Sequence, residues 1–368
     1  MWYNTGMTGI SLKEFIIQKL RRACLYDRTK KIKTLSIAAL FFCGAFFIFI
    51  TSVNRPVASA DTGSSDAIAI RVMPNPDHFS PLRWYSKNVN VQGAPQSLSV
   101  DGYQAVRDGR TVYVNAANIV DNGGDGIYEN YFTNIYIISY NQDADQATMD
   151  ILGQILDHWK FNVNLMNDNG AANKCENIGE EKSCSGETCL DGYVCEGNKC
   201  VIKCLFDKDC PAGGYCLSKK ARLVRDTIRL SDLAEMKIAL KDYHERGYYP
   251  KLESGTYLKG RTISVWPSWQ ENFAGELGLK PLMSDPVNKI GACSDARFKA
   301  ETCWDEEKKE FDDPTPNNGV FNMQAGSKVY YYELKKDDGS EYLLCANLES
   351  DKADFIPSAL SGENCVGD

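Results

Sequence analysis

The sequence predicts an α+β protein built from several modules behind a single N-terminal transmembrane helix. In residues 66–170, β-branched and aromatic runs bounded by turn residues precede a one-faced helix. A second one-faced helix, Ala221 to Arg246, precedes two strands that flank Asp338-Gly339, a hairpin-turn signal. Eight cysteines crowd between these two parts. The predicted parts are a basic cytoplasmic arm (1–33), a transmembrane anchor (34–53), a linker (54–65), an α+β domain (66–170), a cysteine-rich module (175–216), a unit of helix plus antiparallel sheet (221–350) and a tail (351–368).

The anchor is predicted from twenty residues without a charge, "TLSIAALFFCGAFFIFITSV". At ~1.5 Å per residue such a helix spans ~30 Å, the thickness of one hydrocarbon core. Residues 1–33 hold eight Lys/Arg and two acids, so they carry +6, and the positive-inside rule places them in the cytoplasm. A retained anchor is favoured. The alternative is cleavage after Ala60 in "VASA", which would release a secreted protein.

Charge also limits the partners. The whole chain has a formal net charge of −8, so the part beyond residue 53 carries −14. An acidic exported part argues against a nucleic-acid partner, because the phosphate backbone is recognised mainly by clustered Lys and Arg.

The cysteine content supports export, because disulfides persist in oxidising compartments. Twelve of the fourteen cysteines follow the apolar run. The eight in residues 175–216 contain no C-x-x-C pair and no histidine, so zinc is not expected and four disulfides are, with 105 connectivities open. Cys293 and Cys303 enclose a nine-residue loop and are expected to pair, and a bridge from Cys345 to Cys365 would hold down the tail. The cysteines predicted to form disulfides are Cys175, Cys184, Cys189, Cys195, Cys200, Cys204, Cys210, Cys216, Cys293, Cys303, Cys345 and Cys365.

The stretch "CVIKCLFDKDCPAGGYC" (200–216) resembles the small disulfide knots of extracellular proteins, of the Dickkopf N-terminal or EB-module kind. The resemblance covers about forty residues and depends mostly on cysteines. It implies a spacer or a binding module and assigns a role to no particular residue.

The domain at 66–170 resembles no family. Its predicted strands are 67–73, 111–119 and 134–141, and its predicted helix is 145–161. A charged group ahead of the second strand could line a pocket and act as acid and base, although a surface loop with "RDG" as its turn is the favoured interpretation. This group is Asp101, Arg107, Asp108 and Arg110.

A possible calcium loop is also found in this domain. Asn141, Asp143 and Asp145 alternate as ligands of an EF-hand loop would, but Gln146 stands where glycine is needed and Leu152 where glutamate is needed. We therefore expect Asp145 or Gln146 to cap the helix that follows.

The last third of the chain carries a resemblance to a known family. Its motifs are "RDTIRLSDLAEMKIALKDYHERGYYP" (225–250), "LMSDPVNK" (282–289) and the closing "YYYEL…YLLCANLES". In this order the pieces resemble the periplasmic part of type II secretion pseudopilins and type IV pilins. The resemblance implies a long helix covered by an antiparallel sheet. It does not assign a calcium site, because no ligand set of the family aligns here.

Two departures from that family matter for function. The hydrophobic half-helix that packs the core of a pilus is missing, and "GISLKEF" (9–15) is followed by charged residues where a prepilin-peptidase site would be followed by an apolar run. A pilin-like head displayed on a distant anchor is therefore expected. "WPSW" (266–269) and Trp304 could form an exposed patch for a glycan, although core packing is favoured.

The sequence thus predicts a non-catalytic, membrane-anchored bacterial surface protein that binds a protein or a glycan and needs no metal or cofactor. Two alternatives remain open. One is a secreted or surface hydrolase or carbohydrate-active enzyme in residues 66–170, which requires Asp101, Asp108 or His78 to converge in one cleft. The other is an accessory component of a type II secretion or type IV pilus-like machine.

Overall fold

The structure, a computed structural model, describes most of the chain beyond residue 65. The described residues are 66–120, 130–162, 173–176, 183–184, 189, 192–253, 258–312, 324, 326–350 and 364–367. They belong to one unit that spans Ser65–Asp368. The predicted arm, anchor and linker, residues 1–65, lie outside the described part.

The described residues form a mixed α+β fold with several antiparallel sheets and a disulfide-rich region, so the predicted fold class is confirmed at this level. In the part of the chain that the structure describes, no helix has both the length and the apolar composition for a membrane span. The predicted anchor, 34–53, was not among the residues searched.

The middle domain is a five-stranded antiparallel sheet in the order β1-β5-β4-β3-β2. Its elements are β1 (Ile68–Pro74), α3 (Pro81–Asn88), β2 (Gln96–Val100), β3 (Tyr103–Asp108), β4 (Thr111–Val120), β5 (Asn130–Tyr140) and α4 (Gln146–His158). The predicted strands are present as β1, β4 and β5, and the predicted helix as α4. The sequence analysis did not predict α3, β2 and β3.

The added strands arise from two tight hairpins that share β3. Asp101 and Gly102 join β2 to β3 with φ of 50° and 84°, the left-handed pair that a two-residue hairpin turn requires. The "RDG" segment ends β3, with Gly109 at φ 55° before β4 begins, so this turn prediction is confirmed. Asp145 caps α4 by accepting a hydrogen bond from the Thr148 N–H at 2.8 Å, as predicted.

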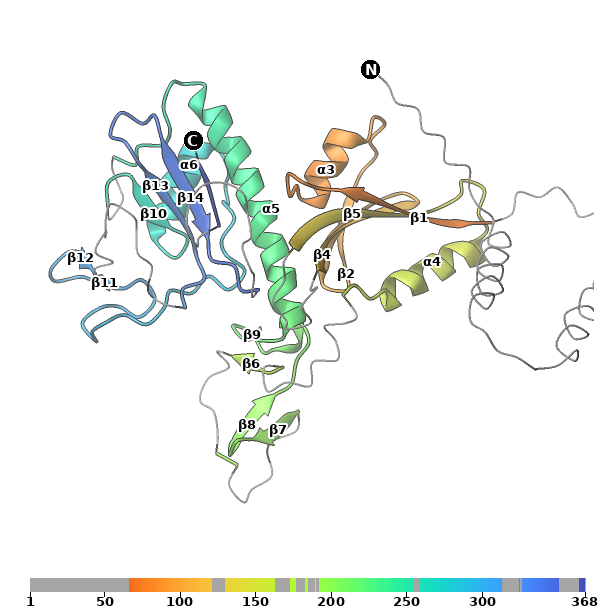
Figure 1. Cartoon of the computed structure of the whole chain (residues 1–368), viewed down its shortest axis with the longest axis horizontal. Coiled ribbons are helices and arrows are strands. Elements are labelled where there is room, and N and C mark those ends of the chain that lie inside the picture. Colours follow the sequence, from red (N-terminus) through yellow and green to blue (C-terminus); the bar gives the residue numbers. More distant parts are fainter. Residues whose placement is uncertain are drawn as a thin grey trace, which may run out of the picture. The chain divides into compact units, whose positions relative to one another are not determined.

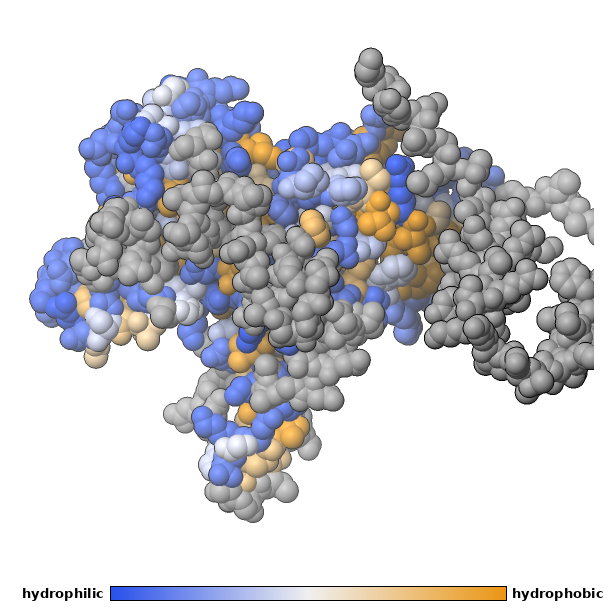
Figure 2. All heavy atoms as spheres, in the orientation of Figure 1, coloured by the Kyte–Doolittle hydropathy of each residue, from blue (hydrophilic) through white to orange (hydrophobic). Residues whose placement is uncertain are grey.

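The middle sheet buries both faces. Val112, Val114 and Ile138 face one core together with Leu152 and Leu156 of α4. The alternate positions face the other core with α3, because successive strand side chains point to opposite faces. Figure 2 shows apolar residues gathered over this domain, whose exposed large side chains include those at positions 70 and 72 of the edge strand β1.

The cysteine-rich module, which we call the knot, has only short strands and a single turn of 3₁₀ helix. They are β6 (Cys175–Glu176), β7 (Tyr193–Glu196), β8 (Lys199–Ile202), η2 (Asp207–Asp209) and β9 (Tyr215–Cys216). Its disulfides are Cys175–Cys210, Cys184–Cys195, Cys189–Cys200 and Cys204–Cys216. These bonds replace a core that so few apolar residues could not form.

The C-terminal part begins with the long helix α5 (Lys219–His244), and Gly247 follows its end with φ 92°. The other elements are β10 (Arg261–Ile263), η3 (Trp269–Phe273), α6 (Ala274–Leu277), β11 (Trp304–Asp305), β12 (Glu310–Phe311), β13 (Tyr330–Leu334), β14 (Tyr342–Ala346) and β15 (Asn364–Gly367). The sheet order is β10-β13-β14-β15, all antiparallel. The predicted hairpin is β13–β14, with Gly339 at φ 82° in its turn.

Two features of this part concern the remaining cysteines. Cys293 and Cys303 form a disulfide. Cys345 is disulfide-bonded, and the strand register places Cys365 opposite it. The predicted tail, 351–368, therefore ends in a strand of the sheet, β15.

Helix α5 packs on both sheets. Leu223, Val224 and Leu230 in its first half belong to the core of the middle sheet. Leu233, Met236 and Leu240 in its second half belong to the core of the C-terminal sheet (Figure 1). The apolar face of α5 thus packs against both sheets, so α5 does not belong to the C-terminal unit alone.

Candidate functional site

The first half of α5 buries charged side chains that the apolar pattern did not reveal. Lys220, Arg225, Asp226 and Arg229 are each at most 1 % exposed. An isolated buried charge is costly, so each needs partners of opposite charge. The helix begins at Ser218, whose hydroxyl accepts the Ala221 N–H and donates to the Leu205 carbonyl of the knot.

Arg229 is the centre of this buried cluster. It binds both carboxylate oxygens of Asp285, from Nε at 2.6 Å and from Nη2 at 2.8 Å. Its Nη1 donates to Asp226 at 2.9 Å and to Glu349 at 2.5 Å. Burial alone would lower the pKa of Arg229, but its hydrogen bonds and charge pairs with these carboxylates outweigh burial and raise it.

Arg225 joins the knot to the C-terminal part. Its Nη1 donates to Asp207 at 2.5 Å and to the Cys216 carbonyl at 3.0 Å. Its Nε and Nη2 each donate to Glu349 at 2.7 Å. Glu349 thus lies between two guanidinium groups. Burial raises the pKa of Glu349, but the two arginines outweigh burial and lower it to about 2.

Asp226 completes the cluster from the other side. Its carboxylate accepts the backbone N–H groups of Glu349 and Ser350 and the Ser350 hydroxyl. Every charged member therefore has a partner, which favours a structural role: α5, the knot, the loop at Asp285 and the end of β14 are fixed to one another.

A separate buried pair connects α5 to the middle domain. The Lys220 ammonium lies 2.8 Å from Asp101 Oδ2 and 3.0 Å from the Phe161 carbonyl, and both charged side chains are fully buried. Burial lowers the pKa of Lys220, against the opposing effect of Asp101. Asp101 also accepts the Phe161 N–H at 2.8 Å.

We expect Lys220→Met to destabilise the protein by about 2 kcal/mol, because Asp101 would remain buried with fewer partners. The loss of stability should be smaller than for a buried charge left with no partner, because the Lys160 ammonium remains 3.4 Å from Asp101. Denaturant unfolding measures it, and Lys237→Met at an exposed position of the same helix is the control. Equal stability of the two variants would contradict a structural role for the pair.

The enzyme alternative named Asp101, Asp108 and His78, and the structure separates the two acids. Asp101 and Asp108 lie at opposite ends of β3, roughly 20 Å apart at ~3.3 Å per residue. Asp108 accepts the Tyr85 hydroxyl at 2.5 Å, and His78 contacts the Thr133 hydroxyl at 3.0 Å. Asp101 and Asp108 therefore do not share a cleft, and the enzyme alternative stays a prediction.

The tryptophans belong to cores. Trp266, Trp269 and Trp304 are 2 %, 0 % and 6 % exposed. The Trp269 indole N–H donates to the Met283 carbonyl at 2.8 Å. The alternative of an exposed aromatic patch is therefore wrong for these three tryptophans. The prediction that they pack in cores is confirmed.

Some cysteine sulfur atoms lie close enough together to be considered as metal ligands. Among the described residues, three groups of side chains lie close enough to hold an ion, and each includes cysteines. All of those cysteines are in disulfides, and a disulfide sulfur is not the thiolate that a metal requires.

Asp232 is a partly buried acid on α5 that the sequence analysis missed. Its carboxylate accepts the Tyr330 hydroxyl at 2.8 Å. Burial, with the nearby charges of Asp285 and Glu235, raises the pKa of Asp232 to about 7. The hydrogen bond from Tyr330 and the charge of Arg229 act in the opposite direction.

We expect Asp232→Asn to stabilise the protein increasingly as pH rises from about 4 to about 7. In that range the folded state holds a proton on Asp232 that the unfolded state has lost, so the free energy of unfolding falls with pH by up to about 1.4 kcal/mol per unit. Asparagine removes this dependence and can still accept the Tyr330 hydroxyl. Unfolding at pH 4.5 and 7.5, with exposed Asp157→Asn as control, tests it. A pH-independent difference between variant and wild type would refute the raised pKa.

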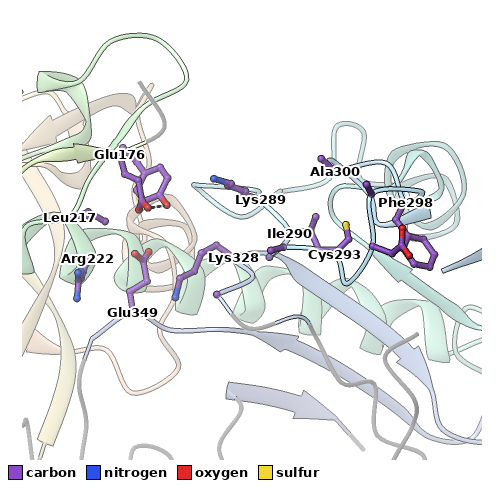
Figure 3. Close-up of a pocket in the computed structure, with 16 residues that line it drawn as sticks. Glu176, Leu217, Arg222, Lys289, Ile290, Cys293, Phe298, Ala300, Lys328 and Glu349 are labelled. Atoms are coloured by element: carbon purple, nitrogen blue, oxygen red, sulfur yellow. Dashed lines mark hydrogen bonds between the residues drawn. The ribbon is translucent and has the colours of Figure 1, made fainter. Parts of the chain in front are cut away.

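A cavity near this cluster has a volume of about 810 Å³. Its walls come from three places (Figure 3): the knot, the first turn of α5, and the loop and strand ends of the C-terminal part. Arg222, Lys289 and Lys328 supply positive charge, and Leu217, Ile290 and Phe298 supply apolar surface.

A second cavity, of about 590 Å³, lies among α3, the second half of α5 and α6. Three of its five charged groups, Arg83, Glu235 and Glu276, are already engaged. Arg83 donates to Glu235 at 2.8 Å through Nε, and the Tyr243 hydroxyl donates to Glu276 at 2.8 Å. The first cavity is therefore the stronger candidate for a binding site.

Comparison with protein-family models, with characterised proteins and with solved structures finds no match to this chain.

Proposed function

We propose that this chain is a membrane-anchored, extracytoplasmic bacterial protein that binds a partner and does not catalyse a reaction. The pilin-like C-terminal part would be its interaction surface. The observation that carries this proposal is the buried ionic cluster on α5. It fixes the knot and the C-terminal sheet to the same helix, which suits a rigid module that presents a surface.

The disulfides support the exported location. Four bonds within the knot and one in the C-terminal loop would persist outside the cytoplasm and would be reduced within it. The charge asymmetry of +6 before the apolar run and −14 after it supports an orientation with residues 1–33 inside.

The long helix packed on an antiparallel sheet supports a pilin-like head. Helix α5 begins directly after the knot, so the apolar half-helix that would pack a filament core does not precede it in the chain. We therefore infer display of a single head and no filament of the pilin kind.

The experiment places one epitope at the N-terminus and one in the exposed turn at Asp337 and Asp338. In spheroplasts, external protease should remove the second epitope and spare the first until the membrane is opened. The reverse pattern, or protection of both epitopes, would refute the export.

Further measurements test whether the protein is anchored in the membrane and whether it assembles into filaments. Alkaline extraction should leave the protein in the membrane fraction, whereas a mature N-terminus at Asp61 would show cleavage after Ala60. Sedimentation of the purified protein should show no long filaments. Filaments would contradict the display function and favour a pilus-like assembly.

A further inference from the structure

The cavity beside the buried cluster has three cations that form no ion pair with any described residue. Arg222, Lys289 and Lys328 all line it. Among the described residues, none of these three side chains forms an ion pair, although the chain beyond residue 53 carries −14. The lining also includes the acids Glu176, Asp295 and Glu349, so what marks the cavity is the set of three cations outside ion pairs rather than its total charge.

Three acids, Glu176, Asp295 and Glu349, line the same cavity, and they differ in their partners. Glu349 is held by Arg225 and Arg229. Glu176 accepts the Tyr215 hydroxyl at 2.7 Å, and Asp295 accepts the Arg297 N–H at 3.0 Å in its own turn. Of these three acids, Glu349 alone has ion-pair partners among the described residues, and the three cations keep their hydrogen-bond donors.

Lys328 and Lys289 hold this part of the wall in place through their backbones. The N–H of each donates to the carbonyl of the other, at 2.9 Å and 2.7 Å. Figure 3 shows both side chains reaching from the C-terminal part toward the side where Glu176 and Glu349 lie. Burial is the largest influence on Lys328 and lowers its pKa, so an anionic ligand would compensate a real desolvation cost.

The remaining surface of the cavity is apolar. Leu217, Ile290 and Phe298 line it, together with small side chains of the loop at 292–300. A volume of about 810 Å³ is in the range of pockets that hold small ligands or a few residues of peptide. A free inorganic anion would use the cations and leave the apolar wall without a partner.

We propose that this cavity binds an acidic peptide segment of a partner protein, with its carboxylates on Arg222, Lys289 and Lys328 and an apolar side chain against Phe298. This inference deepens the proposed function. It rests on that function because the function makes the ligand part of a partner protein.

The test measures peptide binding to the full-length, oxidised protein in detergent. The probes are Ac-Glu-Phe-Glu-NH2 and its neutral counterpart Ac-Gln-Phe-Gln-NH2, titrated at low salt. The acidic peptide should bind at least about tenfold more tightly, which corresponds to about 1.4 kcal/mol. Its advantage should shrink as salt rises. Equal affinities would overturn the proposal.

Variants locate the site. The triple variant R222Q/K289Q/K328Q should lose the preference for the acidic peptide. The control K237Q/K241Q/K259Q removes three exposed lysines outside the cavity and should keep it. Lys289→Glu is a milder change at an exposed position, so it tests the site even if the triple variant fails to fold. Unchanged binding by this variant would overturn the assignment.

Inorganic phosphate is the competing probe. Displacement of the peptide by an equal concentration of phosphate would identify a free small anion as the ligand and refute the peptide assignment. The spheroplast experiment is independent of these titrations, so loss of peptide binding with an externally accessible head would refute only this inference.

Discussion

Replacing Arg229 by methionine should destabilise the protein by about 3–5 kcal/mol, the largest effect expected of a single substitution here. Arg229 is fully buried and neutralises Asp226, Asp285 and Glu349. Its removal would leave buried carboxylates with too few positive partners, and breaking such a pair from one side is far more costly than replacing both sides. Denaturant unfolding with two probes, near-UV and far-UV circular dichroism, measures the loss.

Two controls separate the ionic effect from lost volume. Lys336→Met removes a cation from the exposed pair with Glu341 and should cost less than about 1 kcal/mol. The double variant R229M/D285N should lose less than the sum of its single variants, because Asp285 is the carboxylate that depends most on Arg229. Strict additivity of the two substitutions would contradict the pairing as the source of the effect.

Removing the Cys204–Cys216 disulfide by alanine at both positions should destabilise the knot by about 3 kcal/mol, the value expected for a closed loop of this length. The effect should extend beyond the loop. The Cys216 carbonyl accepts a hydrogen bond from Arg225, and the Cys216 N–H donates to Asp207, so the bond holds the place where α5 meets the knot. Limited proteolysis should then cut the knot before the C-terminal sheet.

The Cys184–Cys195 disulfide provides a matched control. It closes a loop of nearly the same length, a sequence separation of 11 against 12. In the described part of the chain, no hydrogen bond or ion pair joins it to the charged cluster of α5. Its removal should loosen the knot locally and leave the unfolding of α5 and the C-terminal sheet unchanged. If both double variants unfold the α5 cluster equally, loop entropy alone explains the effect.

Strong local patterns allowed much of the fold to be predicted. The β-branched runs of β1, β4 and β5, the apolar stripe of α5 and the Asp338-Gly339 turn each carry their signal within a few residues. Strand β2 is the segment "QSLSV", which has little hydrophobic pattern and owes its place in the sheet to pairing with β3. The hairpin that β2 and β3 form was therefore missed. Helix α3 was missed because eight residues are too few for a periodic signal.

The candidate site required the tertiary structure. Asp101 looked like part of a reactive group with Asp108, yet its partner is Lys220, 119 positions further along the chain. Arg229 meets Asp285 and Glu349 across 56 and 120 positions. No local pattern encodes such pairs, because each charge alone is typical of a solvated helix face.

The sequence by itself determined the α+β class and the use of disulfides in the knot, because periodicity, turn chemistry and cysteine spacing act over short stretches of chain. The tertiary structure alone decided which domain α5 belongs to. It packs on both sheets because its apolar stripe is long enough to cover two cores in succession. It also decided that the charges of α5 are buried, since burial depends on what the rest of the chain places against a residue.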